Sequence, residues 1–168
     1  MKRSIEQRNS ILGYYLGFMI FICIIPGIMV IVAGHTSGSV PRTLIMIVLA
    51  VIGISLSVWS IVYMKKVGEG NPLDAFNHEV GPRTKKLMTE GPYRICRNPM
   101  LLGTFIYYAG IQIRLLSWKA LIIYVLFIAI MAVQVKKEEQ RLEEDFGSEY
   151  TEYRKRTNAF LPKLSRKI

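Results

Sequence analysis

The sequence predicts an all-α integral membrane protein of about four transmembrane helices, folded as a single domain over residues 1–168. Hydrophobic residues make up 51% of the chain. They occur in blocks of about 20 residues, the length that a helix needs to cross the roughly 30 Å hydrocarbon core of a bilayer. Most of the charged residues lie in the segments between these blocks. Apolar blocks separated by charged segments are typical of a membrane bundle.

The first two predicted spans are residues 11–33 and 43–64. In the first, Pro26-Gly27 predicts a kink, which a membrane helix tolerates. The second carries small residues, which let two helix backbones approach closely. These residues are Gly53, Ser55 and Ser57. The sequence therefore predicts a tight helix contact at the middle of the second span.

The next two predicted spans are residues 99–116 and 117–135. Asn98-Pro99 indicates a helix start, because Asn caps helix N-termini and Pro suits the first helical position. The very short connection between the two spans predicts a tight helical hairpin.

The distribution of basic residues predicts the orientation in the membrane. Three basic residues lie in segment 1–10, seven in the polar loop 65–98 and nine after Val135, whereas the two other connections hold three between them. The positive-inside rule then places both termini and the loop in the cytoplasm. We expect a multi-pass protein of a prokaryotic plasma membrane, because the chain is small and carries no eukaryotic targeting signal.

The net charge of +10 raises the question of nucleic-acid binding. The basic residues flank apolar spans, where they usually contact anionic lipid, so we expect membrane lipids as partners and no nucleic acid. A catalytic triad, a phosphate-binding loop and a metal cluster are all missing from the sequence pattern, and no metal site is predicted. The two histidines, His35 and His78, have no predicted role.

The C-terminal tail, residues 136–168, has the pattern of an amphipathic helix. Apolar and aromatic residues recur at helical spacing, with charged residues on the other faces. They are Leu142, Phe146, Tyr150 and Tyr153. Gly147-Ser148 predicts an interruption, with Gly ending one helical piece and Ser capping the next. We expect the tail to cover the loop 65–98 and to form a site with it.

Two groups of charged residues are candidates for that site. Arg94 and Arg97 lie three residues apart near the membrane surface, where they could anchor lipid headgroups or bind a carboxylate or phosphate. Glu138 and Glu139 follow the last span; they are either an ordinary polar helix segment or a pair of which one side chain faces a pocket. Tyr93 could be an interface aromatic residue or a stacking platform.

The order of these motifs resembles one family of integral-membrane methyltransferases, typified by isoprenylcysteine carboxyl methyltransferase and including phospholipid N-methyltransferases. The family pattern reads Leu-Val-x-x-Gly-x-Tyr-x-x-x-Arg-His-Pro-x-Tyr-x-Gly, and residues 87–93 and 97–103 follow it. The resemblance extends over about half of the chain, through the Glu pair and the aromatic stripe of the tail. Asn98 stands where the family has His, and Leu101 where it has Tyr.

The resemblance implies S-adenosylmethionine as cofactor, bound at the cytoplasmic end of the bundle by the loop and the tail. The cofactor-binding residues that it implies are Lys85, Lys86, Leu87, Met88, Tyr93, Asn98, Pro99, Met100, Leu101, Glu138 and Glu139. Arg97 and Asn98 are the candidate catalytic residues, with Arg97 suited to the cofactor carboxylate. The substrate-binding position of the family falls on Gln134, where the family has Arg.

The implied function is methyl transfer to a lipid-like or isoprenylated substrate that enters from the bilayer. The acceptor is a carboxylate, a thiol or an amine, and the oligomeric state stays open. Such a displacement needs alignment and exclusion of water more than a catalytic triad. The alternative is a non-catalytic four-helix scaffold or small-molecule carrier, for which polar residues near the bilayer midplane would be expected. A relative that binds cofactor without turnover is a third possibility, because of Asn98.

Overall fold

The computed structural model describes residues 19–34, 36, 38–68 and 86–163. Within them every regular element is helical. Two are π-helices, η1 (Met19–Ile24) and η2 (Met64–Gly68), and one is a 3-10 turn, η4 (Gly91–Arg94). The α-helices are α2 (Ile25–Ala33), α3 (Val40–Tyr63), α4 (Pro99–Leu115), α5 (Trp118–Phe146) and α6 (Ser148–Arg156).

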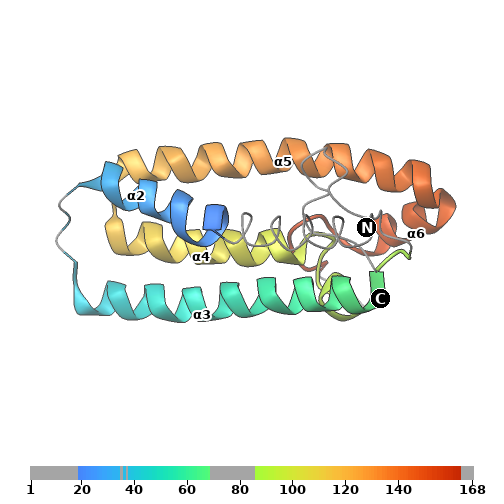
Figure 1. Ribbon diagram of the computed structural model, residues 1–168, viewed down its shortest axis with the longest axis horizontal. Helices are drawn as coiled ribbons and strands as arrows, with labels where there is room; N and C mark the ends of the chain where they lie inside the picture. The colour runs from blue at the N-terminus through green and yellow to red at the C-terminus, as the bar shows by residue number, and fades with distance from the viewer. Residues whose placement is uncertain (1–18, 35, 37, 69–85, 164–168) are drawn as a thin grey trace, which may run out of the picture.

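The helices form an elongated bundle in which α4 lies between α3 and α5, and α2 packs against α4 and α5 (Figure 1). At one end α4 and α5 are joined directly through Leu116 and Ser117. At the other end the 3-10 turn, α6 and the residues after it come together (Figure 1). The predicted helical hairpin is confirmed, and the polar segments meet at one end of the bundle.

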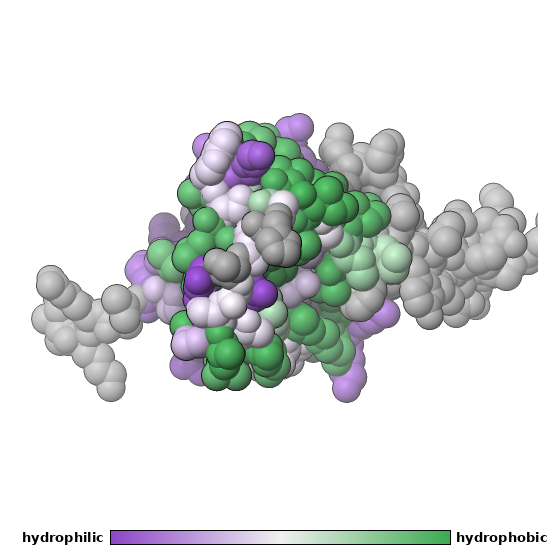
Figure 2. Space-filling model, turned by 90° about the vertical axis from the view of Figure 1, so that its left-hand side faces the viewer, coloured by the Kyte–Doolittle hydropathy of each residue, from purple (hydrophilic) through white to green (hydrophobic). Residues whose placement is uncertain are grey.

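Two helices, Val40–Gly68 and Trp118–Phe146, are long and apolar enough to cross a membrane, and Met19–Ala33 is a shorter apolar helix. Only 17% and 22% of the most apolar parts of the two long helices are buried, unlike the core helices of a soluble protein. Their large apolar side chains point outward instead. On α3 the most exposed are Val40, Leu44, Val48 and Val51, and on α5 they are Trp118, Leu126, Ile130 and Val133. Figure 2, seen along the bundle from the end where α4 joins α5, shows hydrophobic residues over much of this outer surface.

The contact between α3 and α4 depends on glycines at the crossing point. A Cβ atom on Gly53 would lie 2.3 Å from the carbonyl oxygen of Gly103, and one on Gly103 would lie 2.4 Å from the Gly53 oxygen. Ser57 donates a hydrogen bond of 2.9 Å to the Met100 carbonyl in the same contact. The close contact predicted from small residues is confirmed for Gly53 and Ser57. Ser55 is exposed, because its position faces away from α4.

Substituting Gly103 with alanine is expected to destabilise the bundle. The new methyl group would meet backbone and the Ser57 hydroxyl at 2.4 Å, so α3 and α4 would have to separate, at a cost of about 1–3 kcal/mol. Gly27→Ala is the matched control, because a Cβ atom there has no neighbour within 4 Å. Thermal unfolding in detergent should show a clear loss for Gly103→Ala alone; equal midpoints for the two variants would contradict the glycine contact.

The helix that contains the fourth predicted span continues into the predicted tail. α5 runs without a break from Trp118 to Phe146, so the predicted span 117–135 and the first part of the predicted tail helix belong to one helix. The sequence here changes from apolar to charged, yet Lys, Glu, Gln and Arg are good helix formers and neither Gly nor Pro intervenes. The tail is also not one helix to its end, because the chain leaves helical geometry after Arg156.

The predicted helix boundaries at glycine and proline are confirmed, but the predicted caps are not. α5 ends before Gly147, whose φ of 53° ends the helix, and α6 begins at Ser148 without a side-chain cap. α4 begins at Pro99 with Asn98 in the capping position, yet the Asn98 side chain does not bond to the helix. In the first span, the π-helix gives way to α2 just before Pro26; residues 11–18 of that span lie outside the described part of the chain.

Candidate functional site

The centre of the site is the 3-10 turn Gly91–Arg94, which carries Tyr93 into the protein. Gly91 has a φ of 60°, and a Cβ atom there would lie 2.6 Å from the ring of Tyr63. The left-handed conformation and the close ring together require glycine at this position. Tyr93 is 6% exposed and its ring centroid lies 6.1 Å from that of Tyr63 at the end of α3. The turn is therefore held against α3 through an aromatic contact.

The aromatic stripe of the tail packs onto this turn, as the sequence predicts. Tyr150 and Tyr153 form a buried cluster with Leu87 and Tyr93, and five half-buried residues surround it. Tyr63, Met64, Met88, Leu142 and Phe146 pack around this cluster. The Tyr153 hydroxyl donates a hydrogen bond of 2.6 Å to the Tyr93 carbonyl. The tail and the end of α3 therefore both pack against the turn.

Tyr93 and Glu138 bring the loop and α5 together. Burial raises the pKa of the Tyr93 phenol well above its ordinary range, and the nearby Glu138 carboxylate raises that pKa further. The phenol is consequently neutral at physiological pH. Glu138 is half-buried. Glu138 and Tyr93 are 45 residues apart in sequence, yet the charge of the Glu138 carboxylate acts on the Tyr93 phenol.

Arg97 and Glu139 form the strongest polar contact of the site. The Arg97 guanidinium donates through Nη2 at 2.6 Å and through Nε at 2.9 Å to Glu139 Oε1. The two side chains are only 10% and 14% exposed. Nη1 of Arg97 also donates to the backbone carbonyls of Thr157 and Arg154. Arg97 therefore ties the loop, α5 and the C-terminal residues into one unit.

Asn98 is fixed by the C-terminal residues rather than by the helix that it precedes. Its backbone amide donates to the Ala159 carbonyl at 3.0 Å, and its side-chain Nδ2 donates to the same oxygen at 3.1 Å. The neighbouring Arg97 amide donates to the Asn158 carbonyl at 2.9 Å. The expected capping bond would be accepted by the side-chain Oδ1 from a first-turn amide of α4, but the structure instead orients the side chain by the bond from Nδ2 to Ala159.

Cys96 is fully buried beneath these contacts. Burial raises the pKa of its thiol from 9.0 to about 11, against the smaller opposing effects of the Asn98 amide and of Arg97. The raised pKa means that the folded state favours the neutral thiol. This contribution to stability is complete below about pH 9 and is lost as the pH rises through 11.

We expect the alkaline loss of stability between pH 9 and pH 11 to be larger in the wild type than in Cys96→Ala. The two pKa values differ by about 2, which corresponds to at most about 3 kcal/mol. Melting temperatures in detergent from pH 7 to 11 would measure the two slopes. Parallel slopes would contradict the assignment to Cys96, because the buried tyrosines titrate in both proteins.

The other candidates from the sequence lie in three places. Leu87 and Met88 belong to the aromatic cluster, Lys86 is exposed, and Lys85 lies outside the described residues. Pro99 is buried, the Met100 carbonyl bonds to Ser57 and Thr104, and Leu101 packs in the core of the bundle. Gln134 is half-buried on α5, one helical turn before Glu138.

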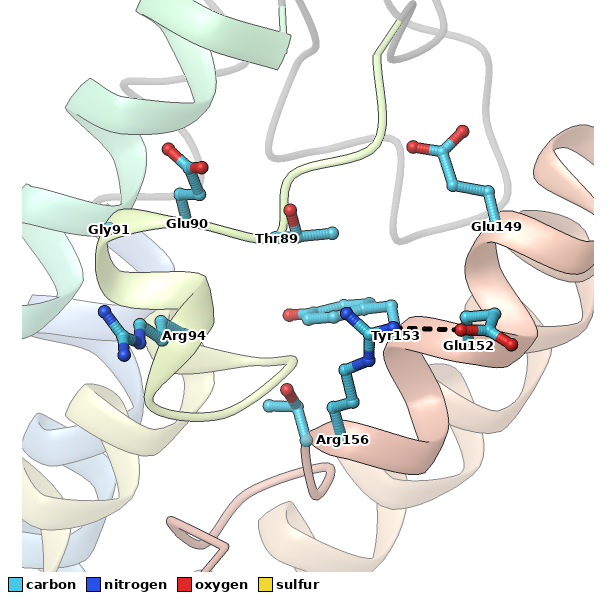
Figure 3. A pocket seen from close by; sticks show the side chains of 9 residues that line it. Thr89, Glu90, Gly91, Arg94, Glu149, Glu152, Tyr153 and Arg156 are labelled. Atoms are coloured by element: carbon cyan, nitrogen blue, oxygen red, sulfur yellow. Dashed lines mark hydrogen bonds and ion pairs between the residues drawn. The ribbon is translucent and has the colours of Figure 1, made fainter.

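An open cavity of about 1030 Å³ lies between the turn and α6. Its lining is polar and carries both signs of charge: Thr89, Glu90, Gly91, Arg94, Glu149, Glu152, Tyr153, Arg156 and Thr157. Figure 3 shows Tyr153 lying in it and Arg156 paired with Glu152, at 3.0 Å. Glu138 and Asn98 are not in its lining. The cavity and the predicted cofactor residues share the turn as a common wall.

No group of three or more metal-binding side chains occurs among the described residues.

Two functional features were not identified from the sequence. Tyr153 was expected only as part of an apolar stripe, yet its hydroxyl holds the Tyr93 carbonyl. The residues after α6 were expected as part of a helix, yet the carbonyls of residues 157, 158 and 159 accept hydrogen bonds from Arg97 and Asn98. Pro162 was the available signal that a helix does not continue to the end of the tail.

Comparison with known proteins identifies a family and several relatives of the chain. A family model described as phospholipid methyltransferase matches residues 41–149, which is more than half of the chain. The chain is 33% identical over 85 residues to the nickel-cobalt-cadmium resistance protein NccN of Alcaligenes xylosoxydans xylosoxydans, covering 51% of the chain and 40% of that relative. It is 32% identical over 103 residues to the protein-S-isoprenylcysteine O-methyltransferase of Rattus norvegicus, covering 59% of the chain and 36% of the relative.

A further relative is protein-S-isoprenylcysteine O-methyltransferase B of Arabidopsis thaliana, 32% identical over 92 residues, covering 52% of the chain and 47% of the relative. The match thus spans less than half of the length of each of these relatives. The family match is broader, since it begins at the start of α3 and ends at the start of α6 and includes the loop and the Glu pair. The chain therefore belongs to the phospholipid methyltransferase family.

Proposed function

We propose that this protein is a membrane-embedded methyltransferase that uses S-adenosylmethionine and acts on a lipid-like or isoprenylated substrate. The observation that carries the proposal is the meeting of the Tyr93–Asn98 segment with the Glu138-Glu139 pair at one end of the bundle. Family membership supports the reaction class. The names of the isoprenylcysteine methyltransferase relatives support an isoprenylated acceptor.

The residues at this end fit the chemistry of S-adenosylmethionine. Its ammonium and ribose hydroxyls need hydrogen-bond acceptors, and its adenine and sulfonium are suited to an aromatic face. The Glu138 carboxylate supplies an acceptor close enough to Tyr93 to raise the pKa of its phenol. The Tyr150 hydroxyl is buried without a hydrogen-bond partner among the described residues, so a polar group is also left over nearby. When bound, the cofactor supplies a methyl group on a sulfonium, which is an excellent leaving group.

In this proposal the protein's residues bind and orient the cofactor and exclude water from it. Glu138 holds a donor group of the cofactor, and Asn98, at the start of α4, directs its polar side chain toward the cofactor. Leu87, Met88 and Tyr93 form an apolar wall, which keeps water from the reacting groups. Glu139 holds Arg97 in place, so its carboxylate is already used within the protein. Alignment of two reactants in such a site can supply about 7–11 kcal/mol of the barrier reduction.

We extend the proposal to membrane topology. The four spans lie in the bilayer with the loop and the tail in the cytoplasm, and the substrate reaches the site laterally from the lipid, passing Gln134 on α5. Lys85, Lys86 and the 98–101 turn complete the cofactor site. Both termini lie in the cytoplasm, as the distribution of basic residues predicts.

The carrier hypothesis is less consistent with the bundle interior. A carrier needs free polar groups at mid-depth, whereas hydroxyl groups described within the helices donate to backbone carbonyls. Tyr107 and Tyr108 bond to Ile22 and Phe21, and Tyr124 bonds to Phe105. Ser57 and Ser60 also donate to carbonyls. The tyrosines and Ser57 link different elements of the bundle, Ser60 bonds within α3, and none of these hydroxyl groups is available for a transported solute.

Methyl transfer tests the proposal. Purified protein in detergent would be incubated with methyl-labelled S-adenosylmethionine in two separate reactions. One reaction contains a membrane lipid extract as the acceptor, and the other contains a farnesylated cysteine analogue. We expect label in the organic phase that depends on the acceptor and is lost in Glu138→Ala. Labelled acceptor from neither source, although the cofactor binds, would favour a relative without turnover.

A further inference from the structure

The four residues Thr157 to Phe160, here named the C-terminal strap, run across the start of α4. They follow α6, whose last backbone hydrogen bond is from the Thr157 amide to the Tyr153 carbonyl at 3.0 Å. Three consecutive carbonyls of the strap, those of residues 157, 158 and 159, accept hydrogen bonds from Arg97 and Asn98. The strap thus contacts the two residues that the sequence singles out as catalytic candidates.

The strap is anchored in the bundle by Phe160. Its ring lies 5.4 Å from that of Phe105 on α4, and Phe105 in turn packs edge-on against Phe127 on α5 at 5.9 Å. Phe160 is half-buried against the main apolar core. The next residue, Leu161, is 67% exposed. The anchor of the strap is therefore one aromatic side chain, and the chain beyond it returns to the surface.

The hydrogen bonds of the strap determine which atom of Asn98 is available. A carbonyl oxygen can only accept, so the Asn98 side chain turns its Nδ2 toward Ala159 and not its Oδ1. The backbone amide of Asn98 donates to the same oxygen. One of the two N–H groups of Nδ2 is used in this bond, which fixes the plane of the amide and leaves Oδ1 as an acceptor for a ligand.

We propose that the C-terminal strap is a positioning element of the cofactor site, which fixes Asn98 so that it offers a hydrogen-bond acceptor. This inference rests on the proposed function, because it takes Asn98 as part of the cofactor site. Phe160 is a positioning residue that acts through the strap. The ligand group facing Asn98 is then a donor, such as an ammonium, an amine or a hydroxyl.

Phe160→Ala tests this role, with Leu161→Ala as the matched control on the next, exposed residue. Removing the anchor should weaken binding of S-adenosylmethionine and of its demethylated product by about 10- to 100-fold, since small misplacements of positioned groups have effects of this size. Leu161→Ala should bind like the wild type. Phe160→Leu should restore most of the affinity. In turnover, KM for the cofactor should rise while KM for the acceptor stays unchanged, a split that general destabilisation would not produce.

The outcomes separate the strap from the function. If the wild type binds S-adenosylmethionine and Phe160→Ala binds it with equal affinity, the strap proposal is overturned and the proposed function stands. No binding by folded wild-type protein would overturn the proposed function and the strap with it.

A measurement on unmodified protein covers the case in which Phe160→Ala does not fold. The demethylated product should slow hydrogen exchange of the Arg97 and Asn98 amides, which donate to the strap. Unchanged exchange at saturating product would overturn the strap proposal.

Discussion

Replacing Glu138 with alanine is expected to weaken binding of S-adenosylmethionine by about two orders of magnitude while the protein still folds and inserts. Glu138 is a half-buried carboxylate near Tyr93, and Glu139 is paired with Arg97. A charge-assisted hydrogen bond in such a place is worth about 2–3 kcal/mol, so binding should weaken by about 100-fold. Isothermal titration calorimetry on detergent-purified variants measures this directly.

Glu144→Gln is the matched control for Glu138. It removes a carboxylate from the same helix, but from an exposed position nearly two turns further on. Its affinity should equal that of the wild type. If Glu138→Ala and Glu144→Gln both bound normally, Glu138 would not be a cofactor ligand, and the site would have to be sought elsewhere on the turn.

Arg97→Ala is expected to have the largest effect on stability. The change removes hydrogen bonds to Glu139 and to two backbone carbonyls, and it leaves a carboxylate that is 14% exposed without its partner. Breaking a largely buried ion pair in this way costs about 3–5 kcal/mol. Cofactor binding should fall as well, because the loop, α5 and the strap lose their common contact. Unfolding in a denaturing detergent measures the loss.

The surface pair Arg156–Glu152 provides the comparison. Its side chains are 78% and 60% exposed, so Arg156→Ala should cost less than about 1 kcal/mol. Arg97→Lys keeps the charge but not the planar fork, and should fall between the two. Equal stability of Arg97→Ala and Arg156→Ala would show that the Arg97 contacts contribute little and would contradict their central place in the site.

The bundle was largely predictable from the sequence because its signals are local. Pro99 and Gly147 mark helix boundaries by backbone chemistry, and the spacing from Leu142 to Tyr153 marks the face that covers the turn. The change from apolar to charged residues at position 136 does not end the helix, for a physical reason. The edge of the apolar block reports where a helix leaves an apolar environment, and a helix of strong formers such as α5 continues beyond it.

The site was less predictable for two reasons. Some of its contacts are made by backbone groups, and in others several carboxylates could bind the same arginine. The strap acts through the carbonyls of residues 157–159, which every residue type possesses, so no side-chain pattern marks it. Arg97 was expected to meet a cofactor carboxylate, and the structure pairs it with Glu139. A guanidinium binds either carboxylate equally well, and only the fold decides which one is near.

Binding of S-adenosylmethionine to the purified wild-type protein tests the central claim most directly. The measurement is calorimetry in detergent, with the demethylated product as a second ligand and Glu138→Ala as the reference. The account predicts micromolar binding of both ligands and much weaker binding in the variant. Absence of binding by protein whose unfolding transition shows that it is folded would contradict the methyltransferase assignment and favour a scaffold or carrier.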